Sequence, residues 1–240
     1  MAKPFTDWTV LPHGKLTPLD DNLLSVTGVL HMPLGDVERR MTVVRLRDGR
    51  SIIYSAIALD EPEMRALESF GRFVFLIVSS DFHRTDVKVW KDLYPDIIVV
   101  ALVGARERVE KVVPVDFTSI DFGDPAVRFV TVPGTAEQEA ALVVETRSGT
   151  TLVLCDLIFN LAHRTGISGW LFQMIGLTGD EPHIAAPIRM RHVSNRDALR
   201  AQLESWAQIP DLERVIIAHG EIITKDSARV LERIAKDLAA

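Results

Sequence analysis

The chain has 240 residues, of which 47 % are apolar and 25 % charged, enough to build a sizeable core. A net charge of −6 argues against a nucleic-acid partner, which requires a basic stripe. No segment has the length and apolar character of a signal peptide or a membrane span. The single cysteine, Cys155, excludes an internal disulfide framework and fits a reducing compartment. We therefore expect a cytoplasmic protein with no nucleic-acid or membrane partner.

The first half of the chain is divided by strong turn and cap residues. Asp48-Gly49 predicts a tight hairpin within residues 41–59, because this pair accepts positive φ angles. Asp60 predicts the cap of a helix that ends at Gly71. An apolar strand over 73–78 then leads through the polar loop "SSDFHRTD" into a helix over 87–95 and a second apolar strand near 97–104.

The second half begins with strands and closes with helices. Ser194 or Asn195 is expected to open a helix, and Thr224 to cap the closing one. Strands without polar alternation indicate sheets that are covered on both faces. This order favours an α/β fold in which two mixed sheets pack face to face with helices outside, an αββα sandwich. No linker or repeat divides the chain, so one domain is expected over residues 1–240. The remaining predicted elements are strands over 128–134, 140–147, 150–156 and 214–220 and helices over 196–209 and 224–239.

Three polar residues follow apolar strands directly. His83 lies just past the strand over 73–78, Asp156 follows "TTLVLC", and His219 follows "RVIIA". The carboxyl ends of strands are where α/β folds collect functional groups. Two imidazoles and a carboxylate are suitable ligands for Zn²⁺ or non-haem iron. The alternative is that each residue only forms a turn with nearby amides.

The segments "IIYSAIALD", "TLVLCDLIFNLAH" and "VIIAHGEII" together resemble the DUF4336 family, a divergent branch of the metallo-β-lactamase-fold superfamily. The resemblance extends from about Leu16 to near the end of the chain. It implies the αββα sandwich of the metallo-β-lactamase type, with metal held between the sheets by strand-end loops. Working members of the superfamily are mostly hydrolases that bind one or two Zn or Fe ions.

The chain departs from the superfamily pattern at several ligands. The first metal loop of the superfamily reads H-x-H-x-D-H. Matching Asp81 and His83 to its leading histidines leaves Thr85 and Asp86 in the remaining places. Thr135 stands where the next histidine is expected, with Glu139 as the nearby substitute.

The resemblance therefore implies a degenerate metal site. The candidate ligands for a single Zn or Fe ion are His83, Asp156 and His219, with Glu139 as a weaker one. Asp81 or Asp86 is the candidate general base. Because so many ligands are missing, the sequence slightly favours a metal-free site in which Asp156 and His219 hydrogen-bond each other.

The segment over about 160–193 has no clean amphipathic period and contains a short helix that is apolar almost all round. Such a helix has to be buried, so we expect a lid over the pocket or a contact in a homodimer. Arg189 and Arg191 are weaker candidates for binding an anionic substrate group, the alternative being a solvated pair. Cys155 is expected to be a buried structural thiol.

Two classes of function remain open. One is a metal-dependent hydrolase of a small ester, thioester, lactone or phosphodiester. The other is a metal-free pseudoenzyme or binding protein that uses the cavity between the sheets for a small molecule or a partner. The number of metal ligands discriminates between them, and the fold alone does not.

Overall fold

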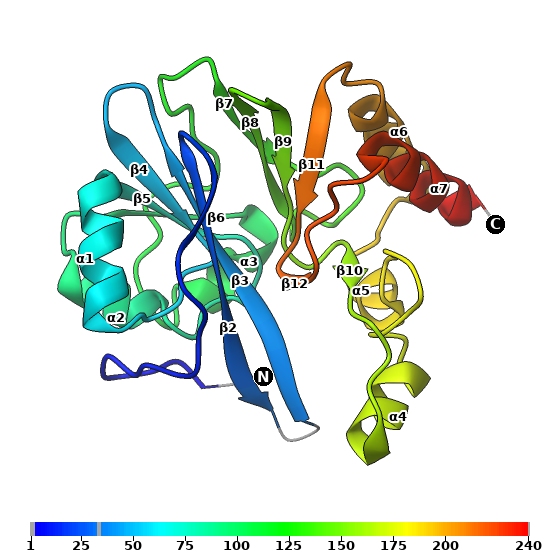
Figure 1. Cartoon of the computed structure of the whole chain (residues 1–240), viewed down its shortest axis with the longest axis horizontal. Helices are drawn as coiled ribbons and strands as arrows, with labels where there is room; N and C mark the ends of the chain where they lie inside the picture. Colours follow the sequence, from blue (N-terminus) through cyan, green and yellow to red (C-terminus); the bar gives the residue numbers. More distant parts are fainter. Residues whose placement is uncertain (1–2, 33–34, 240) are drawn as a thin grey trace.

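The computed structural model describes residues 3–32 and 35–239. Two sheets pack face to face with helices on their outer surfaces (Figure 1), which confirms the predicted αββα sandwich. The first sheet is mixed, and its six strands follow chain order: β1 (Thr17–Asp20), β2 (Leu23–Met32), β3 (Gly35–Arg45), β4 (Arg50–Tyr54), β5 (Arg72–Val78) and β6 (Ile98–Ala101). The second sheet has the order β11 (Leu212–Ile216), β9 (Gly149–Val153), β8 (Ala140–Thr146) and β7 (Val127–Thr131).

Helices cover the outer faces of the two sheets. The first sheet packs against α1 (Glu61–Phe70), α2 (Val87–Leu93) and α3 (Val103–Val109), and the second against α6 (Arg196–Ala207) and α7 (Ser227–Ala239). Between them in the chain lie α4 (Gly166–Met174) and α5 (Ala186–Arg191). A short parallel pair joins β10 (Phe159–Asn160) to β12 (His219–Gly220).

Side chains that alternate along each strand fill three layers of core. On β3, Val43 packs toward the outer helices while its neighbour Val44 packs between the sheets. On β8, Leu142 lies between the sheets while Val143 packs toward α6 and α7. Because both faces of each sheet are buried, neighbouring positions on one strand are all apolar. This explains the continuous apolar runs in the sequence.

Local signals placed several boundaries correctly. Gly49 has φ +82° in the turn between β3 and β4. The side chain of Asp60 accepts a hydrogen bond of 3.1 Å from the backbone N–H of Glu63 and caps α1. Asn195, not Ser194, caps α6 in the same way. The prediction for Thr224 was wrong.

The closing helix starts at Ser227, three residues beyond the predicted cap, and the residue before it, Asp226, has φ +50°. A left-handed residue cannot continue a helix, so the turn here delays its start. The pattern also missed α3, which follows β6 almost directly and has no side-chain cap at Leu102. Within residues 3–32 and 35–239, no helix has the length and apolar character to cross a membrane.

Candidate functional site

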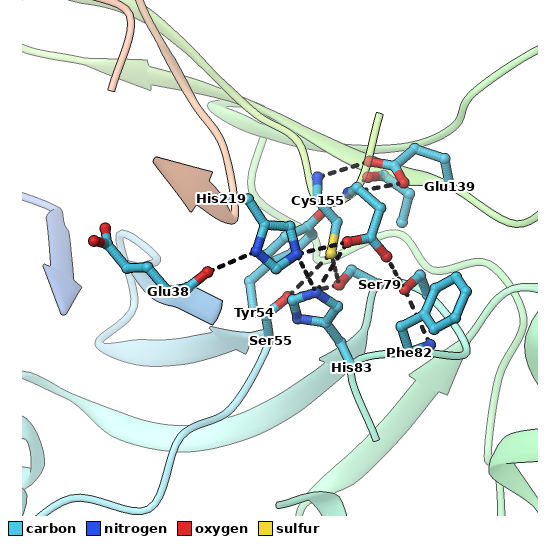
Figure 2. A network of polar contacts seen from close by, with 12 residues as sticks. Glu38, Tyr54, Ser55, Ser79, Phe82, His83, Glu139, Cys155 and His219 are labelled. Atoms are coloured by element: carbon cyan, nitrogen blue, oxygen red, sulfur yellow. Dashed lines mark hydrogen bonds and ion pairs between the residues drawn. The ribbon is translucent and has the colours of Figure 1, made fainter. Parts of the chain in front are cut away.

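The three strand-end residues singled out in the sequence lie together. Asp156 Oδ1 is 3.1 Å from His83 Nε2 and 3.0 Å from His219 Nε2, and the two Nε2 atoms are 3.4 Å apart. His83 comes from the loop after β5, Asp156 from the segment after β9 and His219 from β12, which follows β11. The sandwich therefore brings the carboxyl ends of strands from both sheets to one point. Figure 2 shows the two imidazole rings turned toward each other.

The contact of Nδ1, the ring nitrogen of His219 that faces away from the cluster, shows where this imidazole carries a proton. Nδ1 lies 2.6 Å from the backbone carbonyl oxygen of Glu38, which can only accept, so Nδ1 carries the proton. A neutral ring then has a bare lone pair on Nε2, facing the carboxylate oxygen of Asp156. Two acceptors at 3.0 Å repel each other unless a second proton or a cation lies between them. The geometry is satisfied either by a proton shared among Asp156, His83 and His219 or by a bound metal ion.

Arg40 holds the loop that carries His219. Its side chain is 9 % exposed and donates to the carbonyl oxygens of Ile217 at 3.0 Å and Gly220 at 2.7 Å, one on each side of the histidine. Phe159 stacks on the imidazole with ring centroids 4.8 Å apart. Sequence reasoning missed Arg40, because the two carbonyls that it holds lie 177 and 180 residues away in the chain.

Asp156 is a buried carboxylate with a defined set of donors. Burial by itself would raise its pKa, but the charge of His83 and hydrogen bonds from His219 and His83 hold the pKa well below the ordinary value. Its second oxygen accepts from the hydroxyl of Ser80. Asp156 is therefore ionised at neutral pH, as a metal ligand or an ion-pair partner must be.

Glu139, the weaker ligand candidate, does not reach the cluster of side chains. Its oxygens accept from the backbone N–H groups of Cys155 at 2.6 Å and Asp156 at 3.2 Å, and Figure 2 shows it directed at this backbone. Burial and the nearby charge of Asp156 raise the pKa of Glu139. Glu139 therefore stabilises the backbone that carries Asp156.

A small polar network separates this segment from the first sheet. Cys155 is fully buried between the sheets, and burial raises the pKa of its thiol well above the ordinary value. The Ser79 hydroxyl donates to its sulfur at 2.9 Å and contacts the Ser55 hydroxyl at 2.6 Å. The predicted structural role of the thiol fits this position, since a neutral buried thiol is a poor nucleophile.

Both candidate general bases are bonded to arginines. Asp81 is 1 % exposed and accepts from Arg108 and, at 2.8 Å, from Arg191. Asp86 is also 1 % exposed and is ion-paired with Arg39. Neither aspartate lines the cavity that contains His83, Asp156 and His219. A catalytic role for either aspartate stays a prediction, and these ion pairs weigh against it.

The structure separates the two arginines proposed to bind substrate. Arg191 pairs with Asp81 and lies over the ring of Phe82, with its guanidinium carbon 4.7 Å from the ring centroid. Arg189 lines a different cavity, beside α7. Neither lines the cavity that contains His83, Asp156 and His219.

That cavity has a volume of about 310 Å³ and a polar floor made by the three clustered residues. One wall comes from the β2–β3 hairpin and the other from the segment that contains α4 and α5. The apolar lining residues are Leu30, Met32, Val37, Phe82, Phe159, Ile175, Leu177, Pro187 and Ile188. The predicted lid segment therefore supplies one side of this cavity.

The cluster fits a metal ion in both spacing and chemistry. Ligand bonds of 2.0–2.1 Å in a tetrahedral zinc site place neighbouring donor atoms about 3.3 Å apart. The three donor atoms here are separated by 3.0–3.4 Å. They are the one group of such residues in 3–32 and 35–239 whose ligand atoms lie within 4.8 Å of one another. The contact from His219 Nδ1 to a carbonyl is the outer support that metal-binding histidines usually have.

Comparison with known proteins identifies the fold. No protein-family model and no curated protein sequence matches the chain. Among solved structures, the DIM-1 metallo-β-lactamase exposed to ceftazidime has a TM-score of 0.64 at 12 % identity, covering 97 % of this chain and 100 % of that one. The mono-zinc form of the metallo-β-lactamase FIM-1 from Pseudomonas aeruginosa gives 0.62 at 13 %, covering 95 % and 96 %. A metallo-β-lactamase from Erythrobacter litoralis gives 0.61 at 12 %, covering 92 % and 96 %.

These similarities extend over almost the whole chain. They show that it has the metallo-β-lactamase fold, as the sequence resemblance implied. At 12–13 % identity they show the fold alone. The finer assignment to the DUF4336 branch finds no support in the family comparison.

Proposed function

We propose that this protein is a metal-dependent hydrolase with a single Zn or Fe ion held by His83, Asp156 and His219. The observation that carries the proposal is the spacing of the three donor atoms, which lie 3.0–3.4 Å apart, as neighbouring ligands of one zinc ion do. The Nδ1 of His219 donates to the Glu38 carbonyl, so the ring presents Nε2 to the same point as Asp156 Oδ1. The carboxylate lowers the net charge of the site to +1 for a divalent ion.

A bound ion would supply Lewis-acid chemistry, polarising a carbonyl oxygen and activating water near neutral pH. The residues of the chain do the rest. Arg40 and the Glu38 carbonyl fix the direction of His219, while Ser80 and the backbone held by Glu139 fix Asp156. The apolar walls keep bulk water from the reacting group. An ester, thioester, lactone or phosphodiester is the substrate class that this chemistry supports.

The proposal includes four further assignments. The quoted segments support membership of the DUF4336 branch and a single domain over 1–240 with a lid at 160–193. The single cysteine supports a cytoplasmic location. The apolar surface of α4, where Trp170 is 60 % exposed, supports a homodimer.

The alternative is a metal-free binding protein, and one observation favours it. Thr135, at the place of an expected histidine, is fully buried and donates to the carbonyl of Val132 at 2.7 Å. Glu139, the nearby substitute, does not supply the missing ligand, because it accepts from the backbone N–H of Cys155. In this alternative His219 is an imidazolium that donates to Asp156. The cavity then binds a ligand without hydrolysing it.

Metal content separates these two functions. Plasma mass spectrometry on the untagged full chain is expected to find about one equivalent of Zn or Fe. His83→Ala, Asp156→Asn and His219→Ala should each lose it, and a chelator should lower the Tm of the wild type, because an ion bound only by the folded state stabilises it. His31→Ala is the matched control, as this imidazole is 58 % exposed and outside the cluster. Substoichiometric metal that all four variants leave unchanged would overturn the metal proposal.

A further inference from the structure

The cavity above the cluster has two facing apolar walls. Leu30 and Val37 are directly opposite each other on the antiparallel pair β2–β3, so their side chains form one surface. Ile175, Leu177 and Ile188 face the cavity from the α4–α5 segment. Arg164 donates to the carbonyl of Asp36 at 2.6 Å and ties this segment to the hairpin. The space between the walls is therefore enclosed by aliphatic side chains over the polar floor.

Arg39 is the one arginine in the described lining of the cavity. It is 6 % exposed, and its guanidinium donates to the buried carboxylate of Asp86. Its Nε is itself fully buried, so it presents no donor at the cavity surface. Arg39 therefore gives a ligand in the cavity no free counter-charge.

The charge of the cavity limits the ligand further. Arg39 is the only cationic side chain among its described lining residues, apart from the histidines, and Asp86 already neutralises it. An anionic group on a ligand, placed away from the cluster, would lie against aliphatic carbon without a counter-charge, which is strongly unfavourable. The body of the ligand is therefore apolar and uncharged.

We propose that the site takes acyl esters or thioesters with an aliphatic acyl chain, the chain lying between the β2–β3 hairpin and the α4–α5 segment. This substrate class rests on the proposed hydrolase function. Water adds to the acyl carbon, the bond from that carbon to the leaving oxygen or sulfur breaks, and the leaving atom takes a proton. The products are a carboxylic acid and an alcohol or thiol, with no oxidant or reductant required.

Binding tests the cavity independently of any metal. Calorimetry with octan-1-ol on chelator-treated and on metal-loaded full-length protein is expected to show binding in both. Leu30→Trp should weaken it by about tenfold or more by filling the space. His31→Trp is the matched control, because successive residues of a strand point to opposite faces and His31 is exposed. Absence of octan-1-ol binding, or equal weakening by both variants, would overturn the acyl-chain assignment.

Hydrolysis tests the substrate class. For para-nitrophenyl esters of increasing chain length, kcat/KM should rise by about fourfold per methylene, from about 0.8 kcal/mol per buried CH₂, until the cavity is full. Leu177→Ala should move the optimum to a longer chain. Equal rates for acetyl and octanoyl esters on metal-loaded protein would overturn this inference and leave the metal-dependent hydrolase standing. Octan-1-ol binding by a protein that holds no metal as purified and takes none up on loading would keep the aliphatic binding site and overturn both the proposed hydrolase and the hydrolysis of acyl esters.

Discussion

The loop after β5 and the segments after β9 and β11 meet at the same cluster but are held in different ways. Asp156 and His219 are held through the backbone around them, by the Glu139 carboxylate on one side and the Arg40 guanidinium on the other. These contacts fix the direction of each side chain without using its functional atoms. Asp156 Oδ1 and His219 Nε2 contact only each other and His83 Nε2, and these are the three atoms that a bound ion would share.

In the loop after β5, the charged aspartates stabilise the structure of the loop. Of its charged residues, His83 faces the cluster, whereas Asp81 and Asp86 are ion-paired with arginines. A dense run of polar residues in the sequence is thus mainly a buried support for the loop. The comparison teaches that a candidate group is judged by the contacts its charged atoms make in the fold, and five experiments can break or sharpen it.

The largest effect is expected from Asp86→Ala. Arg39 and Asp86 are buried together, with 7 % and 0 % of their side chains exposed, so the variant leaves an unpaired buried guanidinium. We expect a loss of about 3–5 kcal/mol in the free energy of unfolding, measured with urea. Asp92→Ala is the control, because its pair with Lys88 is on the surface and should cost less than about 1 kcal/mol. Similar losses in the two variants would contradict a structural role for Asp86.

Arg40→Met tests the other loop type. It removes donors from two buried carbonyls beside His219, and each unsatisfied group costs about 1–3 kcal/mol. With the loop released, metal affinity should fall by about 10- to 100-fold, measured by competition with a chelating dye. Arg65→Met, at a side chain that is 63 % exposed, should change neither the free energy of unfolding nor the metal affinity. Unchanged metal affinity in Arg40→Met would show that the hydrogen bonds from Arg40 to the backbone beside His219 are not needed for metal binding.

The pH dependence of stability reports the charge of Asp156. Because folding lowers its pKa below the ordinary 3.8, its stabilising contribution is present above that value and is lost as pH falls through the folded pKa. Each unit of lowering contributes about 1.4 kcal/mol. Subtracting the unfolding curves of chelator-treated Asp156→Asn from those of the chelator-treated wild type should reveal this loss in acid.

Glu139 acts in the opposite direction. Folding raises its pKa through burial and the charge of Asp156, so its contribution is lost as pH rises through its folded pKa. In Asp156→Asn one of these causes is removed, and the pKa of Glu139 should fall, which carboxyl-labelled NMR can follow. An unchanged pKa of Glu139 in this variant would show that the two carboxyls are not coupled.

The smallest expected change is a gain. His192 is 1 % exposed, stacks on Phe82 in the loop after β5 with centroids 5.7 Å apart, and has no partner for either ring nitrogen within the described residues. Burial lowers its pKa, so the ring is neutral. His192→Phe keeps the stack and removes two unsatisfied atoms, which should raise the free energy of unfolding by about 1 kcal/mol. A fall in stability would mean that the nitrogens have partners in solution, and His31→Phe controls for the substitution itself.

The sequence by itself determined the elements whose cause is local. The turn at Gly49, the cap at Asp60 and the apolar runs of β5 and β9 each depend on a few neighbouring residues. The position of His83, Asp156 and His219 after strands was also visible, because strand ends are marked by the change from apolar to polar residues. These signals favoured the sandwich, and together with the family resemblance they placed the three residues in one site, while the alternative that each only forms a turn stayed open.

Only the tertiary structure decided what each polar residue contacts. From the sequence, Asp81 and Asp86 were candidate general bases, and only the fold brings Arg108, Arg191 and Arg39 beside them from elsewhere in the chain. The tautomer of His219 depends on a carbonyl that is 181 residues away in sequence. Contacts of this kind are set by the packing of two sheets against each other, and no short window of sequence contains both partners.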